Sequence, residues 1–248
     1  MKKLYGLIGY PLGHSFSREY HNNRFERNGI DAEYRNYELS DIGELTELIK
    51  SQSSLMGLNV TIPYKELVIP YLDAIDDVAK RIGAVNVIKI SRENGTVRMV
   101  GYNSDYTGFR TSIQNYLQPN HTHALVFGSG GASKAVSTAL QDLGLEVQIV
   151  SRTPGIGEIS YDAITPEIMS QYKVLVNTTP LGMYPNIETC IEIPYELITP
   201  QHLCYDVVYN PQTTMFMRNA LQQGAVVCNG MQMLIGQADA AWDIWSKE

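Results

Sequence analysis

Short apolar runs of strand length alternate with helical patterns through most of the chain. Such alternation predicts an α/β fold with parallel strands. In the first part, the pattern predicts strands over residues 4–9, 32–39 and 55–60, a helix opened by Ser17 that ends near Gly29, and a helix over residues 41–50.

Residues 85–90 and 97–101 read as two further strands joined at Asn94-Gly95, a dipeptide typical of a tight hairpin. The alternation of strands and helices then starts again near residue 123. It predicts strands over 124–127, 146–150, 174–176, 204–208 and 225–227, with helices over 132–143 and 231–245. This restart predicts a domain boundary near Ser104.

Composition narrows the possible functions. The chain has 248 residues, 44% of them hydrophobic and 18% charged, which is typical of a soluble globular protein. Its formal net charge of -7 argues against a nucleic-acid partner, because phosphate binding needs a basic face. No span approaches the roughly 20 apolar residues that a membrane helix needs.

Targeting and cysteine usage point to the cytoplasm. The apolar stretch that follows Lys2 and Lys3 is too short and too broken by glycine and proline to be a signal peptide. The three cysteines are odd in number, lie far apart and do not form a CxxC pair, which fits reduced thiols and argues against a metal site. They are Cys190, Cys204 and Cys228.

The segment GLNVTIPYK, residues 57–65, sets polar groups around an apolar turn. The strand over 55–60 would deliver Asn59 and Thr61 to its exposed end, with Lys65 one helical turn beyond. Such a turn could hold a small polyhydroxylated molecule by neutral hydrogen bonds while one amine handles a proton. The alternative is a strand that stops at a proline, followed by a solvated lysine.

The segment VFGSGGASKA places Gly128, Gly130 and Gly131 between a buried strand and a helix. Glycines in that context let the backbone approach a pyrophosphate, whose charge meets the amides at the start of the helix. Ser133 replaces the third glycine of the dinucleotide-binding fingerprint, so the match is imperfect. A plain turn at the start of a helix is the alternative.

The end of the next strand favours NADP over NAD. An NAD site usually has a carboxylate about 20 residues after the glycines, where it binds the ribose hydroxyl. Here Ser151, Arg152 and Thr153 follow the strand over 146–150. A guanidinium and two hydroxyls suit a 2′-phosphate. The alternative is an ordinary surface arginine at the end of a strand.

Taken together, these segments resemble the shikimate dehydrogenase family over residues 4–238. YPLGHSFSREYHN is similar to the family's serine-rich signature, and further segments match in order and spacing. They are GLNVTIPYK, GAVNV, GYNSDYTGF, VNTTPLGM, DVVYNPQTT and GMQMLIGQA. The chain departs from the family's usual residues at Arg18 in place of proline, at Val87 and Ser104 in place of threonine, and at Ser151 in place of asparagine.

The resemblance implies an α/β substrate-binding and catalytic domain, residues 1–103 with 231–248, and a Rossmann-like NADP-binding domain, residues 104–230. It implies reversible reduction of 3-dehydroshikimate to shikimate by NADPH, a step of chorismate and aromatic amino-acid biosynthesis. The partner is then a small molecule, without nucleic acid or membrane, and the enzyme is a cytoplasmic monomer or homodimer.

The resemblance also implies roles for individual residues. Lys65 and Asp105 would be catalytic, with Lys65 as the acid and base. Residues that would bind the substrate are Ser15, Ser17, Asn59, Thr61, Asn86, Tyr209 and Gln237. Residues that would bind the cofactor are Asp77, Gly128, Ser129, Gly130, Gly131, Ala132, Ser151, Arg152, Thr153, Thr178, Met183, Val207 and Gly230. His14 and His21 are expected to be structural.

Several of these residues have structural alternatives: helix capping for Ser15 or Ser17, a turn for Asn86 and a helix surface for Gln237.

Two other functions compete with the first. A quinate/shikimate dehydrogenase that uses NAD would favour an acidic residue after residue 150, where Ser151 and Arg152 stand. A catalytically silent sensor of the same ligand would be expected to lack Lys65 or Asp105, and both are present.

Overall fold

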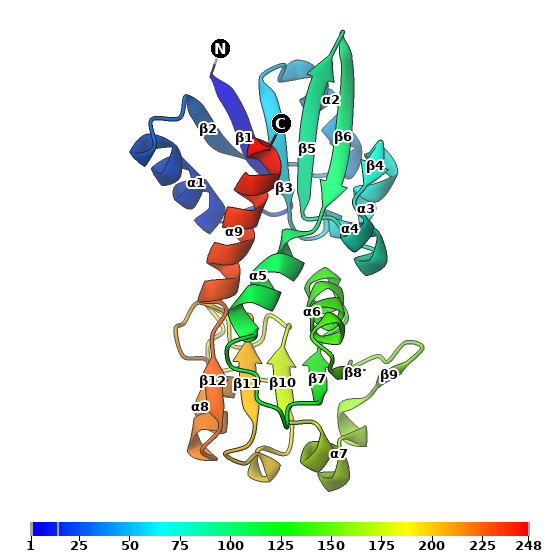
Figure 1. Cartoon of the computed structure of the whole chain (residues 1–248), viewed down its shortest axis with the longest axis vertical. Coiled ribbons are helices and arrows are strands. Elements are labelled where there is room, and N and C mark those ends of the chain that lie inside the picture. Colours follow the sequence, from blue (N-terminus) through cyan, green and yellow to red (C-terminus); the bar gives the residue numbers. More distant parts are fainter. Residues whose placement is uncertain (1, 14, 248) are drawn as a thin grey trace. The chain divides into compact units, whose positions relative to one another are not determined.

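The computed structural model describes residues 2–13 and 15–247; His14 lies outside the described residues. The chain divides into two compact units, Met1–Ser104 with Ala238–Glu248 and Asp105–Gln237. Each unit contains one six-stranded sheet (Figure 1). The assignment of roles, with residues 1–103 and 231–248 for the substrate and 104–230 for the cofactor, stays a prediction.

The sheet of the first unit is mixed rather than parallel. Its order is β2-β1-β3-β5-β6-β4, and the strands are β1 (Lys3–Gly9), β2 (Ala32–Glu38), β3 (Leu55–Val60), β4 (Ala74–Ile75), β5 (Val87–Glu93) and β6 (Thr96–Tyr102). β1, β2 and β3 pair in parallel as predicted, but β5 is antiparallel to both β3 and β6. The hairpin between β5 and β6 is confirmed: Asn94 and Gly95 both have positive φ, 50° and 80°, as a two-residue turn requires.

The helices of this unit are mostly short. They are α1 (Phe16–Arg27), α2 (Leu45–Ser51), α3 (Tyr64–Leu67) and α4 (Asp77–Ile82), with the later part of α9 (Met231–Ser246). The helix predicted over 41–50 is instead a 3-10 turn, Ile42–Glu44, followed by α2. Asp41 caps that turn in a capping box with Glu44. α3 and α4 were not predicted, because one or two turns are too short to show a helical period.

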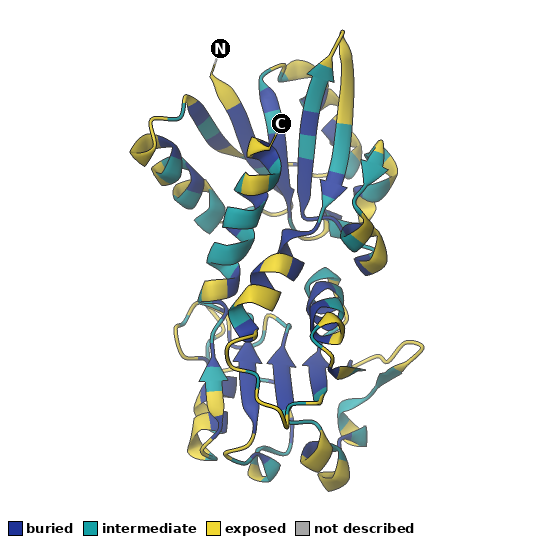
Figure 2. Cartoon of the chain, viewed as in Figure 1, coloured by how far each residue is buried: buried dark blue, intermediate teal, exposed yellow. Residues whose placement is uncertain are grey.

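Residues of β1 alternate between two cores. Leu4 and Ile8 belong to one buried cluster, whereas Tyr5 belongs to another that includes Phe25 and Trp245. The indole Nε1 of Trp245 donates to the Ile88 carbonyl at 3.0 Å, which fixes the end of α9 on the sheet. Both faces of this sheet are therefore covered, and the central strands are largely buried (Figure 2).

All six strands of the second unit's sheet are parallel. Their order is β12-β11-β10-β7-β8-β9, and they are β7 (His123–Phe127), β8 (Glu146–Val150), β9 (Glu158–Ile159), β10 (Val174–Asn177), β11 (Leu203–Asp206) and β12 (Val226–Cys228). Chain order reverses between β7 and β10, which is the doubly wound arrangement of a Rossmann-like fold. The predicted fold class is thus confirmed, and ligands in such sheets bind beyond the carboxyl ends of the strands at the reversal.

The remaining helices are α5 (Ser104–Ile113), α6 (Gly131–Asp142), α7 (Pro166–Gln171) and α8 (Met215–Gln222). α6 and α9 were predicted, and α5, α7 and α8 were not. The α5 segment contains a glycine, two serines and two threonines, which have weak intrinsic helix propensity. Among the described residues, no helix is long and apolar enough to cross a membrane.

Candidate active site

The loop after β1 leads into α1 through a serine cap. Ser15, rather than Ser17, caps the helix: its Oγ accepts the Arg18 amide hydrogen at 3.2 Å, and α1 begins at Phe16. The predicted opening of this helix at Ser17 is therefore wrong, and Ser17 lies in the first turn. Because the cap uses only a lone pair of Ser15, its hydroxyl hydrogen stays available for donation.

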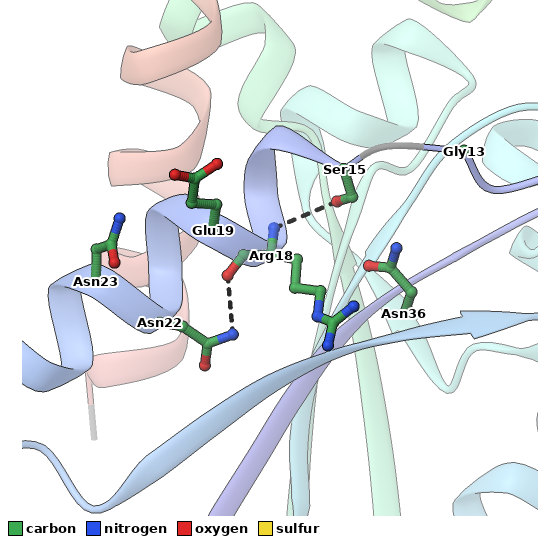
Figure 3. A pocket seen from close by; sticks show the side chains of 7 residues that line it. All are labelled: Gly13, Ser15, Arg18, Glu19, Asn22, Asn23 and Asn36. Carbon is green, nitrogen blue, oxygen red and sulfur yellow. Dashed lines mark hydrogen bonds between the residues drawn. The ribbon is translucent and has the colours of Figure 1, made fainter.

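A cavity of about 540 Å³ lies at the start of α1 and extends toward β2. Figure 3 shows the Arg18 side chain reaching from α1 toward Asn36 of β2. The lining residues are Gly13, Ser15, Arg18, Glu19, Asn22, Asn23 and Asn36. The departure at Arg18 therefore places a cation on the same cavity wall as Ser15, one of the residues predicted to bind the substrate.

Buried amides lie where β3 ends and β5 begins. Asn59 is 5% exposed and Asn86 is 3% exposed. The Tyr34 hydroxyl donates to Asn59 Oδ1 at 2.7 Å, and Asn59 Nδ2 donates to the Asn86 carbonyl at 3.3 Å. Asn86 in turn accepts the Ser104 amide hydrogen at 2.6 Å and donates to Ser104 Oγ at 3.1 Å. The structure thus joins two predicted substrate residues in one hydrogen-bonded chain.

Lys65 lies on α3, the helix that follows β3 and its buried Asn59. It is half-buried, and its carbonyl accepts the Val85 amide hydrogen at 2.7 Å, next to Asn86. Thr61, also half-buried, is held to β1 by its amide, which donates to the Ile8 carbonyl at 2.9 Å. Asn59, Thr61 and Lys65 thus follow one another from the end of β3 into α3, and Asn86 is tied to this segment by the Asn59 amide and by the neighbouring Val85 amide.

Three other predicted residues belong to the second unit. Asp105 is 7% exposed in the first turn of α5, and Tyr209 follows β11. Gln237 lies on α9 and donates from Nε2 to the Leu234 carbonyl at 3.1 Å, a bond within its own helix. A Cβ on Gly108 would lie 2.7 Å from the Gln237 amide nitrogen, so α5 and α9 approach closely there.

The glycine turn lies at the chain reversal between β7 and β10. Gly128 has φ 110°, and a Cβ there would lie 2.8 Å from Thr178 Oγ1. Gly130 is the N-cap of α6 and provides no side-chain cap. The amides of Gly131, Ala132 and the next residue are therefore left for a ligand. An uncapped helix start beside a close backbone approach has the shape that a pyrophosphate needs, so these residues fit a dinucleotide.

The segment after β8 forms a small hydroxyl turn. Ser151 is buried, and its Oγ both donates to the Thr153 carbonyl at 3.3 Å and accepts the Thr153 amide hydrogen at 3.4 Å. Arg152 is exposed between them. Burial raises the pKa of Tyr161, and the nearby charge of Arg152 opposes that rise. Arg152 thus lies at the surface, directly after the end of β8.

Further predicted cofactor residues lie at the ends of neighbouring strands. A Cβ on Gly230 would come within 1.9 Å of the Val207 carbonyl oxygen, so only glycine fits there. Thr178 follows β10 and donates from Oγ1 to the Phe127 carbonyl at 2.6 Å. Met183 is 44% exposed. Asp77, in contrast, lies in the first unit, exposed at the start of α4.

Sequence reasoning missed two buried polar residues. Tyr34 joins the asparagine chain, and nothing in its local sequence signals this. Asp206 accepts hydrogen bonds from Thr214 Oγ1 at 2.6 Å, from the Val208 amide at 3.0 Å and from Asn177 Nδ2 at 3.0 Å. Burial raises the pKa of Asp206 to about 6. VNTTPLGM and DVVYNPQTT, matched separately in the sequence, therefore share one buried network.

Comparison with known proteins agrees with this arrangement. Residues 7–88 match the model of the shikimate dehydrogenase substrate binding domain. The chain is 39% identical to the shikimate dehydrogenase (NADP(+)) of Clostridium beijerinckii, over 99% of this chain and 92% of that protein.

Solved structures give the same result. A shikimate dehydrogenase crystallised with NADP+ superposes with a TM-score of 0.87 at 32% identity, covering 99% of this chain and 90% of that chain. The enzyme from Thermus thermophilus, in complex with NADP(H) and shikimate, has a TM-score of 0.85 at 30% identity, covering 98% and 93%. With such identity over nearly the whole length, the chain belongs to the shikimate dehydrogenase family.

Proposed function

We propose that the protein catalyses the reversible, NADPH-dependent reduction of 3-dehydroshikimate to shikimate. The observation that carries the proposal is that hydrogen bonds hold Asn86 against the segment that carries Asn59, Thr61 and Lys65. The relative from Clostridium beijerinckii is an NADP(+) enzyme, and the neighbour from Thermus thermophilus holds NADP(H) and shikimate. The activity places the protein in aromatic amino-acid biosynthesis.

The substrate offers a carboxylate and ring hydroxyls. Ser15 and Ser17 donate hydroxyl hydrogens to the carboxylate in this proposal. The ring hydroxyls are bound by side chains that can donate and accept, namely Asn59, Thr61, Asn86, Tyr209 and Gln237. Neutral partners suit hydroxyl groups, because burying an unpaired charge against them would cost free energy.

The reduction needs a proton at the carbonyl oxygen. NADPH, when bound, supplies the hydride that adds to the carbonyl carbon. Lys65 donates the proton to the oxygen, and in the oxidation of shikimate its neutral amine takes that proton back. Asp105 orients the ammonium group in this proposal. The exchange balances, since one hydride and one proton convert the ketone into the alcohol.

Binding of the cofactor would rest mainly on the second unit. The amides after Gly130 and the close approach at Gly128 suit the pyrophosphate, and Arg152 with Thr153 suits the 2′-phosphate. The other residues proposed to contact the cofactor are Asp77, Ser129, Gly131, Ala132, Ser151, Thr178, Met183, Val207 and Gly230.

A spectrophotometric assay of NADP+ reduction with shikimate tests the proposal. Turnover with shikimate that exceeds turnover with quinate, and with NADP+ in preference to NAD+, is the expected result. Equal rates with NAD+ and quinate would favour a quinate/shikimate dehydrogenase. Shikimate binding without turnover would favour a sensor, and the absence of both would reject the proposed function.

A cytoplasmic location and a monomeric or homodimeric state complete the proposal. The location is supported by Cys190, Cys204 and Cys228, an odd number of free thiols, which fits a reducing compartment. Light scattering on the purified protein would measure the oligomeric state.

A further inference from the structure

Tyr34 is held rigidly inside the first unit. It lies on β2 with 1% of its surface exposed. Its ring stacks on His21 with centroids 4.9 Å apart and planes 16° apart, and Trp245 lies 6.3 Å away. A phenol ring packed in this way can turn little, so the position of its hydroxyl is fixed by the core.

The partners of Asn59 determine which way its amide points. A backbone carbonyl only accepts hydrogen bonds, so the Asn59 atom 3.3 Å from the Asn86 carbonyl must be Nδ2. Oδ1 then faces Tyr34, whose hydroxyl donates to it at 2.7 Å. Asn59 therefore has both its oxygen and one N–H engaged inside the protein, and its second N–H is left for another acceptor.

Burial keeps the hydrogen on the phenol of Tyr34. It raises the pKa of Tyr34 well above its ordinary value, and the nearby Ser17 hydroxyl opposes only part of that rise. The phenol thus keeps its hydrogen at neutral pH, and it gives that hydrogen to Asn59. The donors run in one direction, from Tyr34 through Asn59 to the Asn86 carbonyl.

We propose that Tyr34 is a positioning residue for substrate binding, which fixes the amide of Asn59 so that it presents an N–H group to a substrate hydroxyl oxygen. This inference rests on the proposed function. Tyr34 acts through Asn59 and needs no contact with the substrate. It also connects β2 to β3, since its hydroxyl donates to Asn59.

The test is a double-mutant cycle between Tyr34→Phe and Asn59→Ala, measured by shikimate oxidation with NADP+. Loss of one neutral hydrogen bond should raise the KM for shikimate about 2- to 10-fold in Tyr34→Phe. In the Asn59→Ala background, Tyr34→Phe should change the KM for shikimate less than about twofold, because the side-chain amide that Tyr34 positions is already absent. The KM for NADP+ should stay unchanged in every variant.

Tyr205→Phe is a matched control. Tyr205 is also 1% exposed, and its hydroxyl is hydrogen-bonded to Ser112 at 2.7 Å in the second unit. This variant should lose comparable stability without a change in the KM for shikimate. Equal KM changes for Tyr34→Phe with and without Asn59→Ala, or no change at all, would overturn the inference. Absence of wild-type activity would instead reject the proposed function.

Asn59→Asp provides a second test should Tyr34→Phe fail to fold. Aspartate keeps an acceptor for Tyr34 but has no N–H for the substrate or for the Asn86 carbonyl. The inference therefore expects a KM for shikimate at least as high as that of Asn59→Ala. A KM close to the wild-type value would show that Asn59 offers its oxygen to the substrate and would overturn the inference.

Discussion

The two units differ in the chemical groups that they present at the ends of their strands. In the first unit, buried side chains bond to one another, with Tyr34 donating to Asn59 at 2.7 Å and Asn86 bonding to Ser104. In the second unit, the side chains at the ends of β10 and β11 bond to one another through Asp206 and Asn177. Glycine stands beside them at Gly128 and Gly230, where a side chain would collide with a neighbouring strand end. One set presents amides and hydroxyls, and the other presents main-chain N–H groups.

This difference fits two kinds of ligand. A neutral hydroxylated ring needs donors and acceptors at particular points, which only oriented side chains provide. A pyrophosphate needs several N–H groups and close access, which glycine and an uncapped helix start provide. We therefore expect that substitutions in the first unit change the kinetics with shikimate, and that substitutions in the second unit change the KM for NADP+.

The largest expected effect is that of Lys65→Ala. Removal of a general acid typically costs about 10²- to 10⁴-fold in rate, so kcat should fall by that amount while the KM for shikimate changes little. Steady-state kinetics with Lys50→Ala, an exposed lysine on α2, as the control would check this. An unchanged kcat in Lys65→Ala would show that Lys65 is not the general acid of the reaction.

The next effect concerns Arg152. Loss of a charge-assisted bond to the 2′-phosphate should raise the KM for NADP+ about 10- to 100-fold in Arg152→Gln, with little change for NAD+. Arg218→Gln, on α8, is the control, since Arg218 faces Glu188 at 3.7 Å. Equal losses for both cofactors in Arg152→Gln would contradict the assignment.

His21, which stacks on Tyr34, should make the stability of the folded protein sensitive to acid. Burial, aided by the charge of Arg24, lowers the pKa of His21 from 6.5 to about 3. The unfolded chain therefore binds a proton that the folded chain excludes, and stability present above pH 6.5 is lost as the pH falls below it. Between pH 6.5 and 5 the loss should be about 2 kcal/mol.

His21→Phe should remove most of that slope, because phenylalanine cannot be protonated. Urea unfolding of both proteins at pH 7 and pH 5 would measure the difference. Parallel loss of stability in the variant and in the wild type would mean that other groups cause the acid sensitivity.

The last of these four effects is that of Gly128→Ala, in the glycine turn of the second unit. A residue with φ 110° is strained with a side chain, and the added methyl would press on Thr178. We expect about a tenfold rise in the KM for NADP+ and no change in the KM for shikimate.

Gly144→Ala is the matched control for this substitution. Gly144 has φ 88° but no heavy atom within 4 Å of its added Cβ, so Gly144→Ala shares the strain without the collision. The same KM for NADP+ in both variants would show that strain alone, and not the site, was responsible.

Local sequence was sufficient for many features. The strand over 55–60 and the strand over 146–150 have their predicted bounds, and the Asn94-Gly95 turn has the conformation that its residues favour. Family membership also followed from motif order alone. The strand bounds and the turn depend on neighbours within a few residues, whose propensities and spacing are visible in the sequence.

Long-range packing decided the rest. The antiparallel direction of β5 against β3 depends on contacts outside the local segment. Local patterns carry no information about these contacts, so the pairing of β5 with β3 could not be predicted from the sequence.

The contrast between Asn59 and Tyr34 is the clearest example. Asn59 could be chosen from the sequence, because GLNVTIPYK places it at the end of an apolar strand. Tyr34, 25 residues away, could not, because its role arises only where β2 and β3 flank β1 in one sheet. The sequence by itself determined which polar groups are available, whereas tertiary structure decided how they are oriented, since a hydrogen bond depends on distance and angle in space.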